Sequence, residues 1–184
     1  MKKLNKDNKG FSLVELLVVI AIMVVLVGVL APTLLGNIEK TREAKDIQAV
    51  DTLAGNVQAA MTDEKIYDAI IGTAGTGDHV YFDLYAGYAG TAFAAASYGE
   101  ANTRLASALD GYLDKDNVYD ATNKIKAFGS KSAKDGKKII VDINVSTGSI
   151  TVALSKSDTV DATALSDANV VKGAKSGNAF SVTR

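Results

Sequence analysis

The sequence predicts an α+β fold in which a long N-terminal α-helix packs against a C-terminal antiparallel β-sheet of three or four strands. Residues 16–38 carry no charged side chain, and the segment that follows is amphipathic with apolar residues three or four apart. The last third alternates apolar and polar residues with a period of two. With 184 residues, 47% of them apolar, the chain has room for one modest domain.

The composition excludes several classes of function. The absence of cysteine rules out a disulfide framework, thiol catalysis and a cysteine-based metal site. A formal net charge of -1 provides no basic field, so nucleic acid is not indicated as a partner. The single histidine, His79, has no serine and aspartate arranged around it as a triad, and we expect it in a surface loop. We therefore expect no enzyme activity, no cofactor and no resident metal.

The first part of the predicted helix is long enough to span a bilayer, since about 20 apolar residues suffice. Lys2, Lys3, Lys6 and Lys9 precede it and predict a cytoplasmic N-terminus. A secretory signal peptide would have a shorter apolar region with a small-residue cleavage site behind it. A plain membrane anchor would leave Glu15, a carboxylate within the apolar run, without an explanation.

Residues 9–15 read Lys-Gly-Phe-Ser-Leu-Val-Glu, and a long apolar run with a proline at position 32 follows. This segment resembles the class III signal of type IV pilins and pseudopilins, and the resemblance covers about residues 1–40. It implies that residues 1–10 are a leader that prepilin peptidase removes by cleaving after Gly10. It also implies that the peptidase methylates the new N-terminal amine of Phe11. The glutamate and the proline of the family pattern match Glu15 and Pro32.

In a filament the apolar helices bundle together, so Glu15 would be a buried charge in need of a partner. The amine of Phe11 in a neighbouring subunit is the partner that we hypothesise, and the pair would set the subunit register. The alternative places Glu15 at the lipid headgroups without a partner. Pro32, with Gly28 and Gly36, either kinks the helix or marks a stretch that bends or melts when subunits leave the membrane.

We expect one helix over about residues 11–63. Residues 11–35 form the hydrophobic half that lies in the membrane or the filament core, and residues 36–64 form the amphipathic half that belongs to the head. The apolar stripe of the second half consists of Ile47, Val50, Leu53 or Ala54, Val57 and Met61. Charged residues such as Glu39, Glu43 and Asp46 belong to the same half of the helix but not to the stripe. One end of such a helix can insert while the other packs on a head domain.

Residues 65–136 correspond to the variable αβ-loop of pilins. Residues 101–113 have a helical pattern, and residues 80–85 alternate as a strand does. The glycine-rich residues 72–78 lack the pattern of a phosphate-binding loop and are expected to form a flexible turn. All seven tyrosines lie between Tyr67 and Tyr119, where they either bind partners or, as we prefer, cap a core that is poor in large residues.

Residues 137–184 are expected to form the antiparallel sheet, with strands over 137–145, 149–155 and 178–183 and a short hairpin loop at 146–148. The side chains expected to face the helix are Ile139, Val141, Ile143, Val145, Ile150, Val152, Leu154, Phe180 and Val182. Those expected to face away are Asp142, Asn144, Thr151, Ala153 and Ser155. The helix stripe is the natural cover for the apolar face.

Pilins often close their C-terminal loop with a disulfide, which this chain lacks. The resemblance therefore leans towards the Gram-positive or cysteine-free members, and hydrogen bonds and docking of the last strand are the expected substitutes. Asp158, Asp161 and Asp167 in this loop are candidate calcium ligands, because pseudopilins of type II secretion bind calcium there. A solvated acidic loop is the ordinary alternative, since calcium needs six to eight oxygens.

The resemblance implies a structural subunit that polymerises into a type IV pilus for adhesion, motility or DNA uptake. Its partners would be copies of itself, prepilin peptidase, and the assembly platform with its ATPase. It would lie in the cell membrane as a single-pass prepilin and then in an extracellular filament. The alternatives are a pseudopilin of a type II secretion or competence system and, from another class, a monomeric membrane-anchored binding module.

Overall fold

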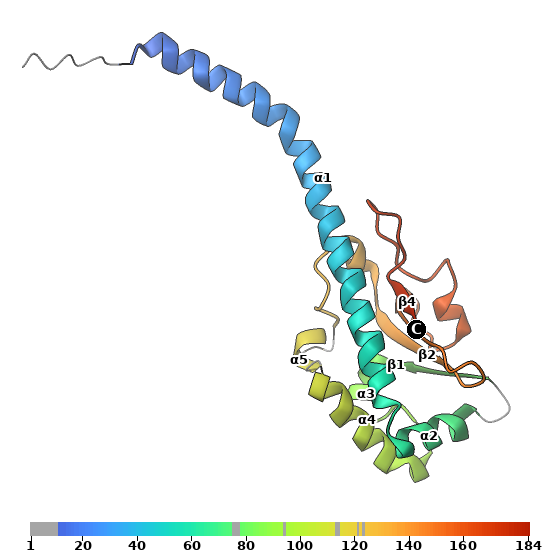
Figure 1. Ribbon diagram of the computed structural model, residues 1–184. Coiled ribbons are helices and arrows are strands. Elements are labelled where there is room, and N and C mark those ends of the chain that lie inside the picture. Colours follow the sequence, from blue (N-terminus) through green and yellow to red (C-terminus); the bar gives the residue numbers. More distant parts are fainter. Residues whose placement is uncertain (1–10, 75–77, 94, 113–114, 121, 123) are drawn as a thin grey trace, which may run out of the picture. The chain divides into compact units, whose positions relative to one another are not determined.

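The computed structural model describes residues 11–74, 78–93, 95–112, 115–120, 122 and 124–184. The chain divides into two units, residues 1–38 and residues 39–184, and one helix, α1 (Leu13–Ala60), contributes to both (Figure 1). The predicted long helix is therefore confirmed. It is uninterrupted at Gly28, Pro32 and Gly36, although Pro32 offers no N–H to the carbonyl of Gly28.

The second unit contains a four-stranded antiparallel sheet with the strand order β1-β2-β3-β4. The strands are β1 (His79–Asp83), β2 (Lys138–Asn144), β3 (Ile150–Ser155) and β4 (Ser181–Thr183). Gly148, with φ of 72°, lies in the turn between β2 and β3, where a residue without Cβ adopts this backbone most easily. The predicted α+β class and its sheet are thus confirmed, and β1 adds a strand from the central region.

The core of the second unit lies between the sheet and residues 47–61, as the apolar stripe predicts. The fully buried members of the stripe are Val50, Leu53, Ala54 and Val57. They pack in one cluster with Ile139, Val141, Ile143, Ile150, Val152, Leu154 and Phe180. Val145 and Val182, which were expected to face inward, are partly buried against the same cluster.

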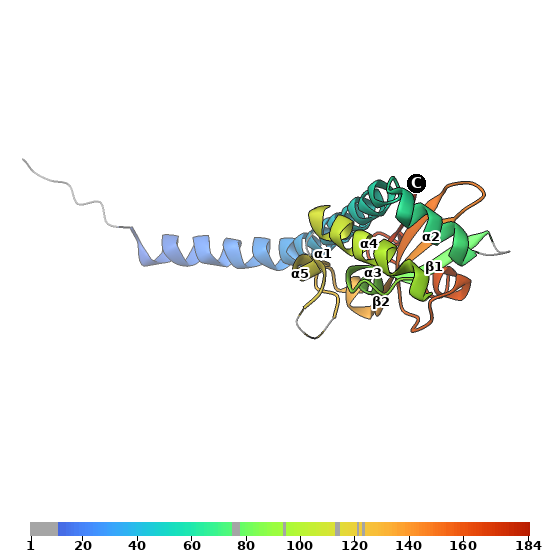
Figure 2. The same cartoon turned by 90° about the horizontal axis from the view of Figure 1, so that it is seen from below.

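The central region is mostly helical. Its helices are α2 (Glu64–Ala74), α3 (Leu84–Tyr88), η1 (Ala96–Tyr98), α4 (Gly99–Tyr112), α5 (Lys115–Val118) and η2 (Ser132–Asp135). Helix α4 contacts both α2 and α3, which in turn contact β1 (Figure 2). The helical pattern of residues 101–113 is confirmed as far as Tyr112. Residue 113 and part of the glycine-rich stretch (residues 75–77) lie outside the described residues.

The strand predicted over residues 80–85 ends two residues early. Leu84 and Tyr85 begin α3 because the side chain of Asp83 accepts a hydrogen bond from the backbone N–H of Tyr85 at 3.1 Å. A carboxylate at this position satisfies an N–H group that the first turn of a helix leaves unpaired. Where an alternating pattern contains an aspartate, the strand can therefore end at that residue and a helix can begin directly after it.

The tyrosines mostly cap the core. Tyr88 and Tyr119 are buried, and the ring of Tyr119 makes edge-to-face contacts with Tyr85 at 5.2 Å and with Tyr88 at 6.2 Å between ring centroids. Burial raises the pKa of the Tyr119 hydroxyl above its usual range, and the nearby Asp83 carboxylate adds to the effect. Tyr67, by contrast, is exposed on α2.

Ala153 and Ser155 lie outside the cluster that packs on the helix, but the expectation that they are open to solvent is wrong, because both are fully buried. Residues that follow β3, including the short helix η3 (Ala162–Leu165), lie against this side of the strand. The hydroxyl of Ser155 donates a hydrogen bond to the carbonyl of Ala164 at 2.8 Å. An irregular segment therefore covers part of the face that the alternation assigns to solvent.

The packing of α1 on the sheet makes a direct prediction. Leu53 has no exposed surface, whereas Leu35, on the same helix, is 67% exposed. We expect Leu53→Ala to lower the free energy of unfolding by about 3 kcal/mol, through lost burial and the cavity that remains. The matched substitution Leu35→Ala should change it little. Urea denaturation of the detergent-solubilised chain measures both, and equal losses would contradict this packing.

Candidate functional site: the N-terminal segment and the carboxylates of the long helix

The N-terminus of α1 is closed by a reciprocal cap. The backbone N–H of Ser12 donates to the Glu15 carboxylate at 2.9 Å, and the hydroxyl of Ser12 accepts from the backbone N–H of Val14 at 3.3 Å. This is a variant of the capping box, in which the glutamate binds the N–H of the serine but the serine hydroxyl binds the N–H of Val14 rather than that of Glu15. The spacing Ser-x-x-Glu is visible in the sequence, but it was not recognised there.

The cap gives Glu15 a local role in the free chain. Its negative charge lies in the first turn, where the unpaired N–H groups of the helix favour an anion. Phe11, one residue before the cap, is 89% exposed. The expected cleavage bond joins it to Gly10, which lies with the rest of the leader outside the described residues. Cleavage there would place the new α-amine next to the capping box.

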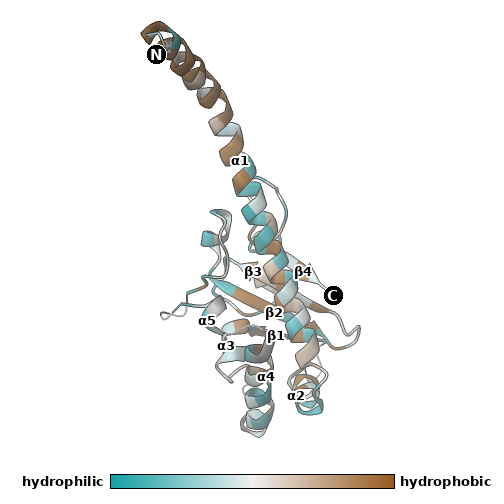
Figure 3. Cartoon of the chain, turned by 60° about the vertical axis from the view of Figure 1, so that its left-hand side comes forward, coloured by the Kyte–Doolittle hydropathy of each residue, from teal (hydrophilic) through white to brown (hydrophobic). Residues whose placement is uncertain are grey.

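The first unit exposes an apolar surface around its whole helix. Nineteen of the 22 large apolar residues that are exposed in the described chain lie between Phe11 and Ile38. The helix is mostly hydrophobic over this part and mixed beyond it (Figure 3). It is long and apolar enough to cross a membrane. Soluble monomers rarely expose an apolar surface of this extent, so lipid or other protein must cover it.

Three carboxylates on the second part of α1 are buried, although the sequence pattern placed them outside the apolar stripe. Glu39, Glu43 and Asp46 are 8%, 0% and 4% exposed. Their spacing of four and three residues puts them on one face of the helix. A buried carboxylate is costly unless it is hydrogen-bonded, so the partners of these three groups decide whether this part of the head is stable.

Backbone N–H groups from two distant segments supply these partners. Asp46 accepts from the N–H groups of Gly129 and Ser130, both at 2.8 Å, and Glu39 accepts from that of Lys131. Hydrogen bonds to a charged acceptor are stronger than those between neutral groups. The carboxylates therefore hold residues 129–131 on the surface of α1. These three residues belong to no helix or strand.

Glu43 binds the C-terminal segment in the same way. Its carboxylate accepts from the backbone N–H groups of Lys175 at 3.1 Å and Ser176 at 2.8 Å, and from the hydroxyl of Ser132 at 3.0 Å. Gly173 lies so close that a Cβ there would be 2.6 Å from a carboxylate oxygen of Glu43. Hydrogen bonds thus hold the C-terminal loop of this cysteine-free chain, as the sequence analysis expected in general terms.

The environment of Glu43 makes its ionised form stable. Burial by itself would raise the pKa of this carboxyl, but the hydrogen bonds from Lys175, Ser176 and Ser132 outweigh burial and hold the pKa below its usual value of 4.5. A group whose pKa is lowered by folding stabilises the fold above its unfolded pKa. That stabilisation is lost as the pH falls through the pKa of the folded state.

The three candidate calcium ligands do not converge. Asp158 pairs with Lys137 at 2.6 Å, and Asp167 pairs with Lys172 at 3.3 Å. Asp161 caps η3 by accepting from the backbone N–H groups of Thr163 and Ala164. Within the described part of the chain, no three histidine, cysteine or acidic side chains lie together as metal ligands would. Each carboxylate therefore has its own partner.

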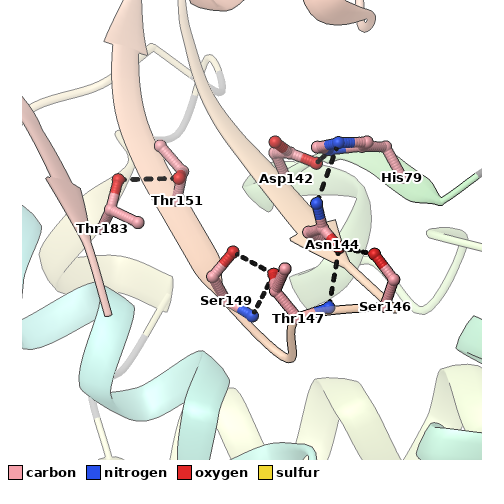
Figure 4. Close-up of polar contacts among 8 residues, drawn as sticks. All are labelled: His79, Asp142, Asn144, Ser146, Thr147, Ser149, Thr151 and Thr183. Carbon is pink, nitrogen blue, oxygen red and sulfur yellow. Dashed lines mark hydrogen bonds and ion pairs between the residues drawn. The ribbon is translucent and has the colours of Figure 1, made fainter.

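His79 was expected in a loop but begins strand β1. Its Nδ1 lies 2.8 Å from Asp142 Oδ1, and its Nε2 lies 3.1 Å from the Nδ2 of Asn144 (Figure 4). The prediction failed because β1 pairs with β2, which places His79 opposite Asn144. The side chain of Ser146 donates to Asn144, not to the imidazole, so the pair lacks the hydroxyl contact of a nucleophilic triad.

Comparison with known proteins bears on the N-terminal segment alone. Residues 5–31 match a family model described as the prokaryotic N-terminal methylation motif. No curated protein and no solved structure matches the chain. The match covers residues 5–10 of the expected leader, the Gly10–Phe11 bond, the capping box and most of the exposed apolar helix.

The hydrogen bonds of Glu43 predict a pH-dependent stability. We expect Glu43→Gln to lower the free energy of unfolding by about 2 kcal/mol at neutral pH, because an amide offers one acceptor oxygen and no charge. The difference from the unsubstituted chain should shrink as the pH falls below 4.5, the usual pKa of a glutamate. Thermal unfolding over a pH series measures it. Asp68→Asn, at an exposed position of α2, is the control, and a pH-independent difference would contradict the assignment.

Proposed function

We propose that this type IV pilin-like protein, which carries a prepilin peptidase processing motif, is a structural subunit that polymerises into a type IV pilus. Cleavage after Gly10 removes four lysines and one aspartate and leaves a mature chain with 16 basic and 20 acidic residues. The peptidase methylates the amine of Phe11. The N-terminal apolar helix anchors the prepilin in the membrane until the assembly machinery extracts it.

The observation that carries the proposal is the exposed apolar surface of residues 11–38, which contains one charged side chain before Glu39. Lipid covers this surface in the membrane. Outside the membrane, the corresponding helices of neighbouring subunits are the natural cover, because they present the same apolar surface. One segment thus serves as anchor and then as the core of a filament.

Glu15 gives the assembly its register. In the free chain its carboxylate caps the backbone N–H of Ser12. In the filament it exchanges this neutral donor for the methylated amine of Phe11 from an adjacent subunit. An ion pair in an apolar surrounding is strongly destabilised when one partner is missing, by about 3–5 kcal/mol, so subunits that are out of register are rejected.

The architecture of the head favours a pilus over a pseudopilin. The second unit spans residues 39–184, and α2, α3 and α4 extend it beyond the sheet. A large decorated head suits a subunit that is displayed on the cell surface. A pseudopilin of a secretion or competence system is the second candidate, and it shares the anchor and the processing motif. Members of this family are typically non-enzymatic structural subunits.

The filament and the role of Glu15 can be tested together. Antibody to the head should label long surface filaments on cells that produce the unsubstituted chain. Glu15→Gln should be processed normally, as mass spectrometry of the N-terminus would show, yet form at least about tenfold fewer filaments, because glutamine keeps the capping box but removes the charge.

Ser12→Ala is the matched control. It removes the hydroxyl half of the cap at a cost of about 1 kcal/mol but keeps both the backbone N–H that Glu15 binds and the charge of Glu15, so filaments should still form. Normal filaments with Glu15→Gln would contradict the register hypothesis. If the antibody labelled only the membrane of cells that produce the unsubstituted chain, this result would contradict the assignment as a pilus subunit and favour a pseudopilin.

A further inference from the structure

The head carries a concentrated positive charge on a chain that is acidic overall. Residues 124–138 contain a single acid, Asp135, and six lysines: Lys124, Lys126, Lys131, Lys134, Lys137 and Lys138. We refer to these six lysines as the basic surface. Their segment includes η2 and the residues that the carboxylates of α1 hold in place.

Buried carboxylates of Glu39, Glu43 and Asp46 bind the backbone and Ser132 of this segment, but they form ion pairs with none of its lysine side chains. Lys137 pairs with Asp158, and Lys138 pairs with Asp83 at 3.5 Å. The other four lysines of the basic surface are exposed and form no ion pair with any residue that the structure describes. An anion that binds beside these ammonium groups would supply the counter-charge that they lack.

A cavity of about 490 Å³ opens within the basic surface. It is lined by Lys124, Ile125, Ala133, Lys134, Gly136 and Lys137. Gly136 contributes no side chain, and a Cβ at this position would lie 2.4 Å from Leu154. The cavity therefore combines ammonium groups with apolar walls, which suits a ligand that has an anionic group next to an apolar part.

One residue of the basic surface, Lys131, is bound close to the end of the apolar segment. The backbone N–H of Lys131 is bound to Glu39, which follows Leu35 by four residues. Four residues span at most about 14 Å even when fully extended, so this holds for any orientation of the two units. The distance is comparable with the screening length of about 8–10 Å at physiological salt, and lysines this near a membrane respond to its charge.

We propose that the basic surface binds the anionic phospholipid headgroups of the membrane that anchors the prepilin. This inference rests on the part of the proposed function that makes residues 11–38 a membrane anchor. The binding holds the head on the bilayer while the subunit waits for assembly, and it is released when the subunit is extracted. A nucleic acid is the alternative polyanion, but the contact of Lys131 with Glu39 favours the membrane, because it places Lys131 near the end of the anchor.

The test reconstitutes the full chain into vesicles of phosphatidylcholine, with or without phosphatidylglycerol, and measures lysine acetylation by mass spectrometry. Lys124, Lys126, Lys131 and Lys134 should react at least about threefold more slowly when phosphatidylglycerol is present, and high salt should abolish the difference. Lys65 is exposed on α2, away from this segment in the sequence, and should react equally in both. Equal rates for the basic surface would overturn the proposal.

Two additions to the phosphatidylcholine vesicles distinguish a lipid from other anions: inorganic phosphate and a DNA oligonucleotide. If inorganic phosphate protected the four lysines as well as phosphatidylglycerol does, the ligand would be a free anion and the lipid assignment would be overturned. The same degree of protection by the oligonucleotide would overturn it in favour of a nucleic acid. Replacing the four lysines by glutamine should make the acetylation of the remaining Lys137 and Lys138 independent of lipid charge. Co-sedimentation of the chain with both kinds of vesicle verifies the anchor separately.

Discussion

The head depends on buried carboxylates of α1 that accept hydrogen bonds from backbone N–H groups far away in the sequence. Glu39 and Asp46 bind residues 129–131, and Glu43 binds residues 175 and 176. The sheet and the apolar stripe explain how the helix packs, but neither explains how the irregular segments stay on it. In a chain without cysteine, these charge-assisted bonds connect the C-terminal loop to the helix.

This arrangement divides the long helix into two parts with different tasks. Up to Ile38 its surface is apolar and exposed, and it is available to lipid or to other subunits. From Glu39 onward it carries an apolar stripe for the sheet and a row of carboxylates for the loops. The proposed lipid contact follows from the same row, because Glu39 holds Lys131 beside the start of the head.

Sequence patterns predicted α1, α4 and most of the sheet because each of these patterns has a short-range physical cause, whereas α2, α3 and α5 were not predicted. The period of α1, the alternation in β2 and β3, and the processing motif could all be read directly from neighbouring residues. The partners of Glu43 could not, because backbone N–H groups leave no pattern in a sequence. Ala153 and Ser155 were misplaced for a related reason, since an irregular segment covers them.

Amide hydrogen exchange of the full chain in detergent tests the central claim most directly. In Glu43→Ala the backbone amides of Lys175 and Ser176 should lose about tenfold or more of their protection. Those of Gly129 and Ser130, which Asp46 binds, should change little. Unchanged protection at Lys175 and Ser176 would contradict the account, because the loop would then be held on α1 by something other than the buried carboxylate.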